Sequence, residues 1–185
     1  MSVREPRQPG LRQLTRSLNA AARRQRKLAG EQAEQAAALQ RQAQLDPGTG
    51  LLLRPNFVLR LQGLLRGAQA TPSGLVLVRV PRLEAINERL GHDAADRVLG
   101  AVADVLLTYV ERVRGAVAGR LNGSDFGLLL PAAGVAAETA RSVHETLSAS
   151  PALRAAGVEV FVGAADGLVD VAAGAALAEA DAALA

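Results

Sequence analysis

The chain has 185 residues, enough for one domain of ordinary size plus an appendage. Apolar residues make up 49% of it and aromatic residues only 2%, so the core must be built mainly from Leu, Val and Ala, and no aromatic platform for stacking bases is expected. Because the chain contains no cysteine, a disulfide framework, a thiolate metal site and a thiol redox role are excluded.

Charge divides the chain into two parts. Residues 1–45 hold nine Arg or Lys and three Glu, a net charge of +6, whereas residues 46–185 hold twelve Arg and fifteen acids, a net charge of −3; together they give +3. Nucleic-acid binding is not expected, because the larger part is acidic and poor in aromatics. No stretch reaches the roughly 18 apolar residues that a membrane helix needs, and the N-terminus lacks the apolar run of a signal peptide.

The first part favours a long helix. After Pro6 and Pro9, residues 11–45 contain no proline and one glycine and are rich in Ala, Gln, Arg and Leu. Leucines on heptad positions a and d form a weak seam that could pair in a homodimer, although glutamines interrupt it. The seam leucines are Leu11, Leu14, Leu18, Leu28 and Leu39. A solvated helix without a partner is the alternative.

The second part begins with a helix stop. Residues 46–50 (DPGTG) end the long helix, because proline disfavours helical geometry in the residue before it and two glycines permit a tight turn. A helix is expected over residues 55–68, and the apolar run 75–80 predicts a buried central strand. Apolar residues recur every three or four positions over 83–109, with Gly91 separating two helices.

A β-hairpin is expected next. The strand-like runs 116–121 and 125–130 flank Asn122-Gly123, and Asn-Gly between two such runs is the strongest short hairpin signal. Three further elements are a helix over 135–147, a strand over 158–162 and a final helix over 171–184. This order predicts an α+β fold, an α/β sandwich in which helices flank a mixed sheet.

Three segments of the chain, in order and at fixed distances, carry known sequence motifs. Residues 45–57 (LDPGTGLLLRPNF) resemble the opening motif DPLTGLxNRxxF, with departures at Gly48 and Leu53. Residues 78–96 (VRVPRLEAINERLGHDAAD) resemble DxDxFKxINDxxGHxxGD, and residues 120–126 (RLNGSDF) resemble RxGGDEF. The closing ADAAL at 180–184 is similar to ADxALYxAK. Together these segments resemble the GGDEF family of diguanylate cyclases. The resemblance implies a mainly antiparallel sheet of the nucleotide-cyclase, polymerase-palm type.

The same resemblance implies that catalytic residues are missing. The family transfers phosphoryl groups from GTP in a dimer, with metal ions held by carboxylates. Those carboxylate positions fall on Arg79 and Ser124, and the lysine that meets the triphosphate falls on Glu84. Arginine cannot coordinate a cation, serine is a poor Mg²⁺ ligand, and glutamate repels phosphate. Pro81 replaces a further acidic residue, so no metal, no cofactor and no catalysis are expected.

The remaining signature positions have other interpretations. Asn122 replaces the first glycine of the motif and adds bulk where the nucleotide approaches the backbone, while Gly123 is kept. Asp125 and Phe126 keep the last part of the signature and are interpreted as hairpin geometry and core packing. The degenerate signature is therefore Asn122, Gly123, Ser124, Asp125 and Phe126.

Two ligand sites of the family can be compared with this sequence. Asn87 and Asp96 match the pair that binds guanine, although they could equally cap or brace the helix break at Gly91. The inhibitory RxxD site for cyclic di-GMP aligns with Val113 and Ala116, so it is expected to be absent.

Residues 1–45 resemble the end of a HAMP domain and a signalling helix, with Glu5-Pro6 as the lead-in. The resemblance as a whole predicts an inactive GGDEF domain over 46–185 that relays signals, dimerises through the N-terminal helix and is coupled to a downstream output domain such as EAL. It also predicts a membrane anchor upstream, which would hold this domain on the cytoplasmic side of a bacterial inner membrane, and a truncated C-terminus. The alternatives are a regulatory pseudoenzyme that binds GTP weakly and, less favoured, an active diguanylate cyclase.

Overall fold

The computed structural model describes residues 19, 22–32, 44–66 and 70–184 and divides the chain into two units, residues 1–43 and 44–185. In the first unit residues 22–32 are helical, and Lys27 pairs with Glu31 one turn later at 3.8 Å. Leu28 of the predicted seam is 54% exposed on this helix. The other seam leucines, Leu11, Leu14, Leu18 and Leu39, lie outside the described residues.

The predicted end of the long helix at residue 45 is wrong. Gln44 lies in a turn, and Leu45 forms an antiparallel bridge with Leu52. Pairing of Leu45 with an extended residue requires an extended backbone, which is incompatible with a helix. Within the described ranges, no helix combines the length and the apolar character needed to cross a lipid bilayer.

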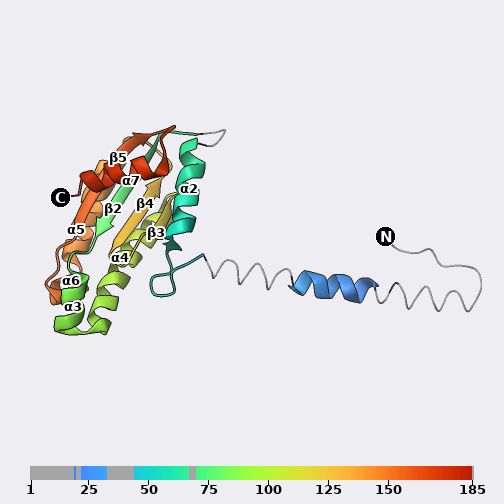
Figure 1. The fold of residues 1–185 in the computed structure, drawn as a ribbon, viewed down its shortest axis with the longest axis horizontal. Helices are drawn as coiled ribbons and strands as arrows, with labels where there is room; N and C mark the ends of the chain where they lie inside the picture. The colour runs from blue at the N-terminus through green and yellow to red at the C-terminus, as the bar shows by residue number, and fades with distance from the viewer. Residues whose placement is uncertain (1–18, 20–21, 33–43, 67–69, 185) are drawn as a thin grey trace, which may run out of the picture. The chain divides into compact units, whose positions relative to one another are not determined.

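The second unit is built on a five-stranded sheet with the order β1-β3-β4-β2-β5 (Figure 1). The strands are β1 (Leu52–Leu53), β2 (Ser73–Arg79), β3 (Val117–Arg120), β4 (Asp125–Leu130) and β5 (Phe161–Leu168). Strand β1 runs parallel to β3, while the β3–β4, β4–β2 and β2–β5 pairs are antiparallel. The predicted α+β class, with a mixed and mainly antiparallel sheet, is confirmed.

Helices cover both faces of this sheet (Figure 1). They are α2 (Arg54–Arg66), α3 (Leu83–Leu90), α4 (His92–Arg112), α5 (Ala136–Ala149), α6 (Pro151–Ala156) and α7 (Ala173–Ala182). Side chains alternate across a strand, so Val76 and Val78 of β2 join one core with α4 and α5, whereas Leu75 and Leu77 join a second core with α2 and α7. Strand β2 is therefore apolar on both faces, as its continuous apolar run predicted.

A pair of glycines positions α2 against the sheet. Gly119 of β3 lies directly opposite Gly127 of β4 in the strand register, and the ring of Phe57 from α2 covers both. A Cβ atom built on either glycine would lie 2.7 Å from an atom of that ring. Because a side chain at either position would displace Phe57, the glycines allow the ring to be fully buried.

Several predicted elements differ from the structure in their bounds. The hairpin is confirmed, but its loop has four residues, 121–124, and Gly123 does not adopt the positive φ that an Asn-Gly turn of two residues requires. The last strand begins at Phe161 rather than 158, since Val158 donates its main-chain N–H to Leu153 after α6. Neither β1 nor α6 was predicted, because two and six residues are too few to establish a periodicity.

Candidate functional site

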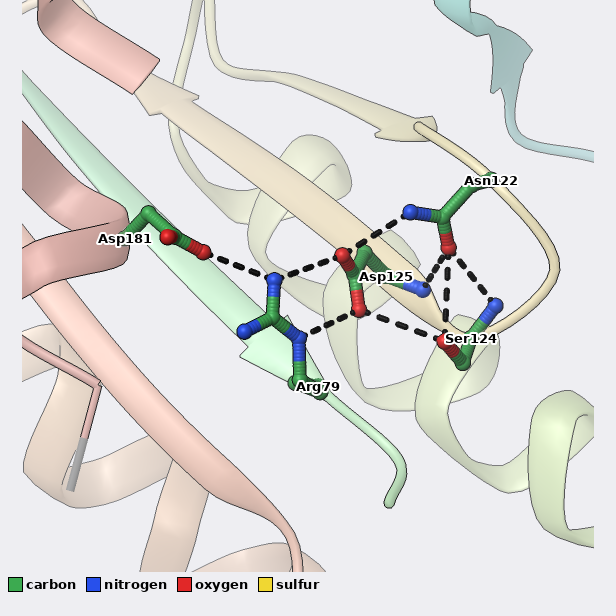
Figure 2. A network of polar contacts seen from close by, with 5 residues as sticks. All are labelled: Arg79, Asn122, Ser124, Asp125 and Asp181. Carbon is green, nitrogen blue, oxygen red and sulfur yellow. Dashed lines mark hydrogen bonds and ion pairs between the residues drawn. The ribbon is translucent and has the colours of Figure 1, made fainter. Parts of the chain in front are cut away.

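The site begins with a charged pair across two neighbouring strands. Arg79 ends β2, and Asp125, the first residue of β4, lies directly opposite it in the register. The guanidinium donates from Nε to Asp125 Oδ1 and from Nη2 to Asp125 Oδ2, both at 2.8 Å (Figure 2). Two parallel hydrogen bonds between a planar guanidinium and a carboxylate are a strong and geometrically specific pairing. The sheet register therefore fixes the position of the Arg79 guanidinium.

A third residue joins this pair from the last helix. Arg79 Nη2 also lies 2.7 Å from Oδ1 of Asp181, near the end of α7 (Figure 2). The Asp125 side chain is 15% exposed, compared with 39% for Arg79 and 51% for Asp181. The hydrogen bond to Asp125 and the second bond to Asp181 raise the pKa of Arg79 despite its partial burial. The guanidinium is thus shared by two carboxylates that are distant in the sequence.

The Asp125 carboxylate is held in its ionised form. Burial would raise its pKa, but hydrogen bonds from Arg79 and Asn122, together with the charge of Arg79, outweigh burial and lower the pKa of Asp125. The Ser124 hydroxyl also lies 3.3 Å from Asp125 Oδ1. A carboxylate that accepts several such bonds remains a charged acceptor well into acid.

The loop 121–124 is organised by the side chain of Asn122. Its Oδ1 accepts the main-chain N–H groups of Ser124 at 2.8 Å and Asp125 at 2.7 Å, and its Nδ2 donates to Asp125 Oδ2 at 2.9 Å (Figure 2). An Asn side chain that bonds the main chain two residues later imitates a backbone turn. The predicted role of Asp125 in hairpin geometry is consistent with these contacts, and Phe126 is fully buried in the core.

A second arginine connects the loop to the opening turn, residues 46–50. Arg120 Nη1 donates to Asp46 Oδ2 at 3.1 Å, while Nε and Nη2 donate to the carbonyls of Asn122 at 3.2 Å and Gly123 at 2.9 Å. Asp46 also accepts the N–H of Thr49 at 2.9 Å and its hydroxyl at 2.6 Å. Burial alone would raise the pKa of Asp46, but the bonds from Thr49 and Arg120 lower it.

Among the described residues, the predicted guanine pair, Asn87 and Asp96, forms no side-chain hydrogen bond with this network. Asn87 on α3 has a buried Oδ1 for which the described residues provide no hydrogen-bond partner, and Asp96 is exposed on α4. Neither side chain caps α4, because its N-terminus at Gly91 has no side-chain hydrogen bond. The break is braced instead by the main chain, where Gly91 N–H donates to the Asn87 carbonyl at 2.9 Å.

The other predicted positions form no side-chain hydrogen bond or ion pair with this network among the described residues. Glu84 is exposed in the first turn of α3, Val113 follows α4 and Ala116 is buried before β3. Sequence reasoning missed Asp46, Arg120 and Asp181 as partners in the site. The motif strings contained all three, but their contacts span 74 and 102 residues of sequence, which no local pattern encodes. Across the described ranges, no group of three or more His, Cys, Asp or Glu is arranged to hold a metal ion.

The sheet order, the flanking helices and the loop between β3 and β4 define a nucleotide-cyclase fold of the palm type. Residues 43–185 match the family described as Diguanylate cyclase, GGDEF domain, and the chain belongs to this family. The family resemblance inferred from the sequence motifs is therefore confirmed.

Individual relatives agree with this assignment. The chain is 35% identical over 100 residues to the Escherichia coli (strain K12) protein named Probable diguanylate cyclase DgcE, a match that covers 53% of this chain but only 9% of DgcE. The coiled coil and GGDEF domain of Caulobacter crescentus DgcB, solved with c-di-GMP, superpose with a TM-score of 0.72 at 20% identity, covering 90% of this chain and 91% of that one.

A third relative has a further domain. The S helix-GGDEF-EAL structure of Vibrio cholerae LapD, bound to c-di-GMP, superposes with a TM-score of 0.68 at 20% identity and covers 82% of this chain and 36% of that one. At such identities the two solved structures establish the shared fold.

Proposed function

We propose that this GGDEF domain makes no cyclic di-GMP and acts as a signal-relay and dimerisation module in cyclic di-GMP signalling. The observation that carries the proposal is the guanidinium of Arg79, which stands where the family resemblance implies a metal-binding carboxylate. It forms an ion pair with Asp125 and another with Asp181. Both carboxylates are thereby neutralised by the protein's own cation, and the electrostatic demand for a metal ion is removed.

Two further positions support the absence of catalysis. Ser124 supplies a neutral hydroxyl in place of the second metal-binding carboxylate, and that hydroxyl is directed toward Asn122 and Asp125 at 3.4 and 3.3 Å. Glu84 brings a negative charge to the position of the phosphate-binding lysine. Phosphoryl transfer depends on positioned cations around the triphosphate, so each change opposes the reaction in the same direction.

The partners follow from the likeness to multidomain relatives. We infer that the N-terminal helix pairs with a second copy, as the coiled coil in the name of the DgcB structure suggests, and that an output domain such as EAL follows, as in LapD. The exposed Leu28 on the helix 22–32 supports pairing through this segment. We place the domain on the cytoplasmic side of a bacterial inner membrane, with an anchor upstream of residue 1.

The proposal is tested by incubating the purified chain with GTP and Mg²⁺ or Mn²⁺ and separating the nucleotides by chromatography. We expect no cyclic di-GMP, and none from the triple variant Arg79→Asp, Glu84→Lys, Ser124→Glu, because Asn122 still adds bulk to the signature turn. Product from the unchanged chain would overturn the proposal and would favour an active diguanylate cyclase with unusual ligands. Product from the triple variant alone would show that the three charges are sufficient for catalysis.

A second candidate function is a regulatory pseudoenzyme that binds GTP. The observation that favours it is the buried Oδ1 of Asn87, which has no hydrogen-bond partner among the residues that the structure describes, since a buried acceptor without a donor is rare in native structures. Rotation of the amide toward the surface would offer this oxygen to the N–H groups of guanine, with Asp96 as the second acceptor. Titration calorimetry with GTP in EDTA tests this function: heat that is lost in Asn87→Ala supports it, and no heat in the unchanged chain rules it out.

A further inference from the structure

Polar contacts run without interruption from the opening turn to the last helix. Asp46 bonds Arg120, whose guanidinium holds the carbonyls of Asn122 and Gly123. The Asn122 side chain bonds Asp125 at 2.9 Å. Asp125 then pairs with Arg79 at 2.8 Å, and Arg79 pairs with Asp181 of α7 at 2.7 Å (Figure 2). These contacts join the segment that follows the N-terminal unit to the helix nearest the C-terminus.

The inner part of this path is partly shielded from water. The Asp46, Asp125 and Arg120 side chains are 14%, 15% and 20% exposed. Ion pairs at such positions are screened less by salt than pairs on the open surface, and removal of one partner leaves a poorly solvated charge. A change at one member therefore alters the preferred position of the next, which is the physical requirement for coupling along a network.

The end of α7 packs closely against β5, so it can be displaced by a change at Arg79. Gly163 of β5 lies beneath it: a Cβ at this glycine would collide with the Ala180 carbonyl and lie 2.8 Å from Leu184 N. On the neighbouring strand β2, Arg79 lies opposite the first residue of β5, Phe161. Because the main chain of residues 180–184 rests directly on β5, a small displacement of Arg79 acts on the terminal turn of α7 through Asp181.

We propose that this path couples the opening turn to α7, with Arg79 as its central connection, so that a conformational change delivered at residues 46–50 alters the stability of the last helix. The inference deepens the relay function proposed above and rests on it. It gives Arg79 a role of its own, in addition to the absence of a metal-binding carboxylate at this position. The arginine joins the sheet to α7, whereas a carboxylate at position 79 would repel both Asp125 and Asp181.

The coupling is tested by amide hydrogen exchange, followed by mass spectrometry, on the full 185-residue chain. The variant Asp46→Asn breaks the first link at the opening turn, and Thr49→Val is a milder perturbation that removes only the 2.6 Å hydroxyl bond. We expect each to speed exchange in the peptide covering α7, by about threefold or more for Asp46→Asn, a change within the range that network mutations produce. Glu179→Gln, an exposed acid on the same helix, is the matched control and should leave α7 unchanged.

The role of Arg79 is tested by repeating the exchange in two backgrounds. In Arg79→Gln, which breaks the connection, Asp46→Asn should add no further change to α7. In Arg79→Lys, which keeps the charge but loses the paired geometry, a reduced response should remain. The coupling would be refuted if Asp46→Asn loosened only residues 44–53, or if it affected α7 equally in the Arg79→Gln background. Neither result bears on the nucleotide assay of the proposed function. Cyclic di-GMP production in that assay would overturn the proposed function but not the coupling.

Discussion

Substitution of Gly127 by alanine should destabilise the domain through a single, well-defined clash. The new Cβ would lie 2.7 Å from Cζ of Phe57 and 2.9 Å from Cε1, whereas nonbonded carbon atoms normally lie about 3.5–4.0 Å apart. The ring must therefore move by roughly 1 Å, the shortfall between these two separations. Phe57 is fully buried in one cluster with Leu61 and Leu65, and protein cores are packed too densely to receive a displaced ring without strain.

The magnitude follows from two opposing effects. Overpacking of a core costs about 1–3 kcal/mol, while replacing a strand glycine by alanine recovers about 0.5–1 kcal/mol of backbone entropy. These ranges leave a net loss of up to about 2.5 kcal/mol, and the roughly 1 Å shift of a buried ring places the expected loss in the free energy of unfolding in the upper half of that range, measured by urea denaturation and far-UV circular dichroism.

Gly100 in α4 provides the matched control, because a Cβ there meets nothing within 4 Å. Gly100→Ala should stabilise the domain by about 0.5–1 kcal/mol, the opposite sign. The double variant Phe57→Leu, Gly127→Ala should lose less than the sum of its single variants, since the smaller side chain relieves the clash. If Gly127→Ala were as stable as the unchanged protein, the sheet and α2 would not be packed as described.

Two further predictions concern capping and acid stability. Asp166 of β5 accepts the N–H groups of Gly134 at 2.7 Å and Ala136 at 3.0 Å, and so caps α5 from outside the helix. Asp166→Ala should lower the free energy of unfolding, measured in urea, by about 0.5–2 kcal/mol. If the free energy did not fall, this cap would not contribute to stability. The pKa values of Asp46 and Asp125 are lowered in the folded protein, because their hydrogen bonds outweigh burial. Each ionised carboxylate therefore stabilises the folded protein fully at pH values above its unfolded pKa of about 3.9, and this contribution is lost as the pH falls toward the lower pKa of the folded state. Between pH 6 and pH 3 the free energy of unfolding should fall less steeply in Asp125→Asn than in the unchanged chain. Identical slopes of this free energy against pH would contradict the assigned pKa directions.

The sequence predicted the fold where its periodicity is long. The helix pair around Gly91 and the apolar strand before Arg79 follow from repeated spacing and from burial on both faces, and both are found near the predicted positions. Short elements were missed, because α6 has six residues and β1 gains its partner, β3, only through the tertiary fold. The turn chemistry was misjudged because Asn122 uses its side chain, rather than a left-handed Gly123, to close the loop.

Four residues of the polar network, Arg79, Asn122, Ser124 and Asp125, were singled out from the sequence, but their contacts were not predicted. Motif comparison indicated that a carboxylate is absent at position 79, yet it gave no reason to expect that the arginine there would meet two acids. Its pairing with Asp125 depends on the register of β2 against β4, and its pairing with Asp181 depends on how α7 packs on β5. Both are tertiary properties that one sequence does not encode locally.

The charge balance explains why an arginine is tolerated at position 79. Asp125 is largely buried, and a buried carboxylate without a compensating cation would be costly or would take up a proton. A metal ion can supply that compensation in a catalytic domain; under the proposed function, the guanidinium of Arg79 supplies it permanently. On this argument, the exchange of a carboxylate for arginine removes a requirement for metal while preserving the hairpin, and it adds a connection to α7 that a bound ion would not provide.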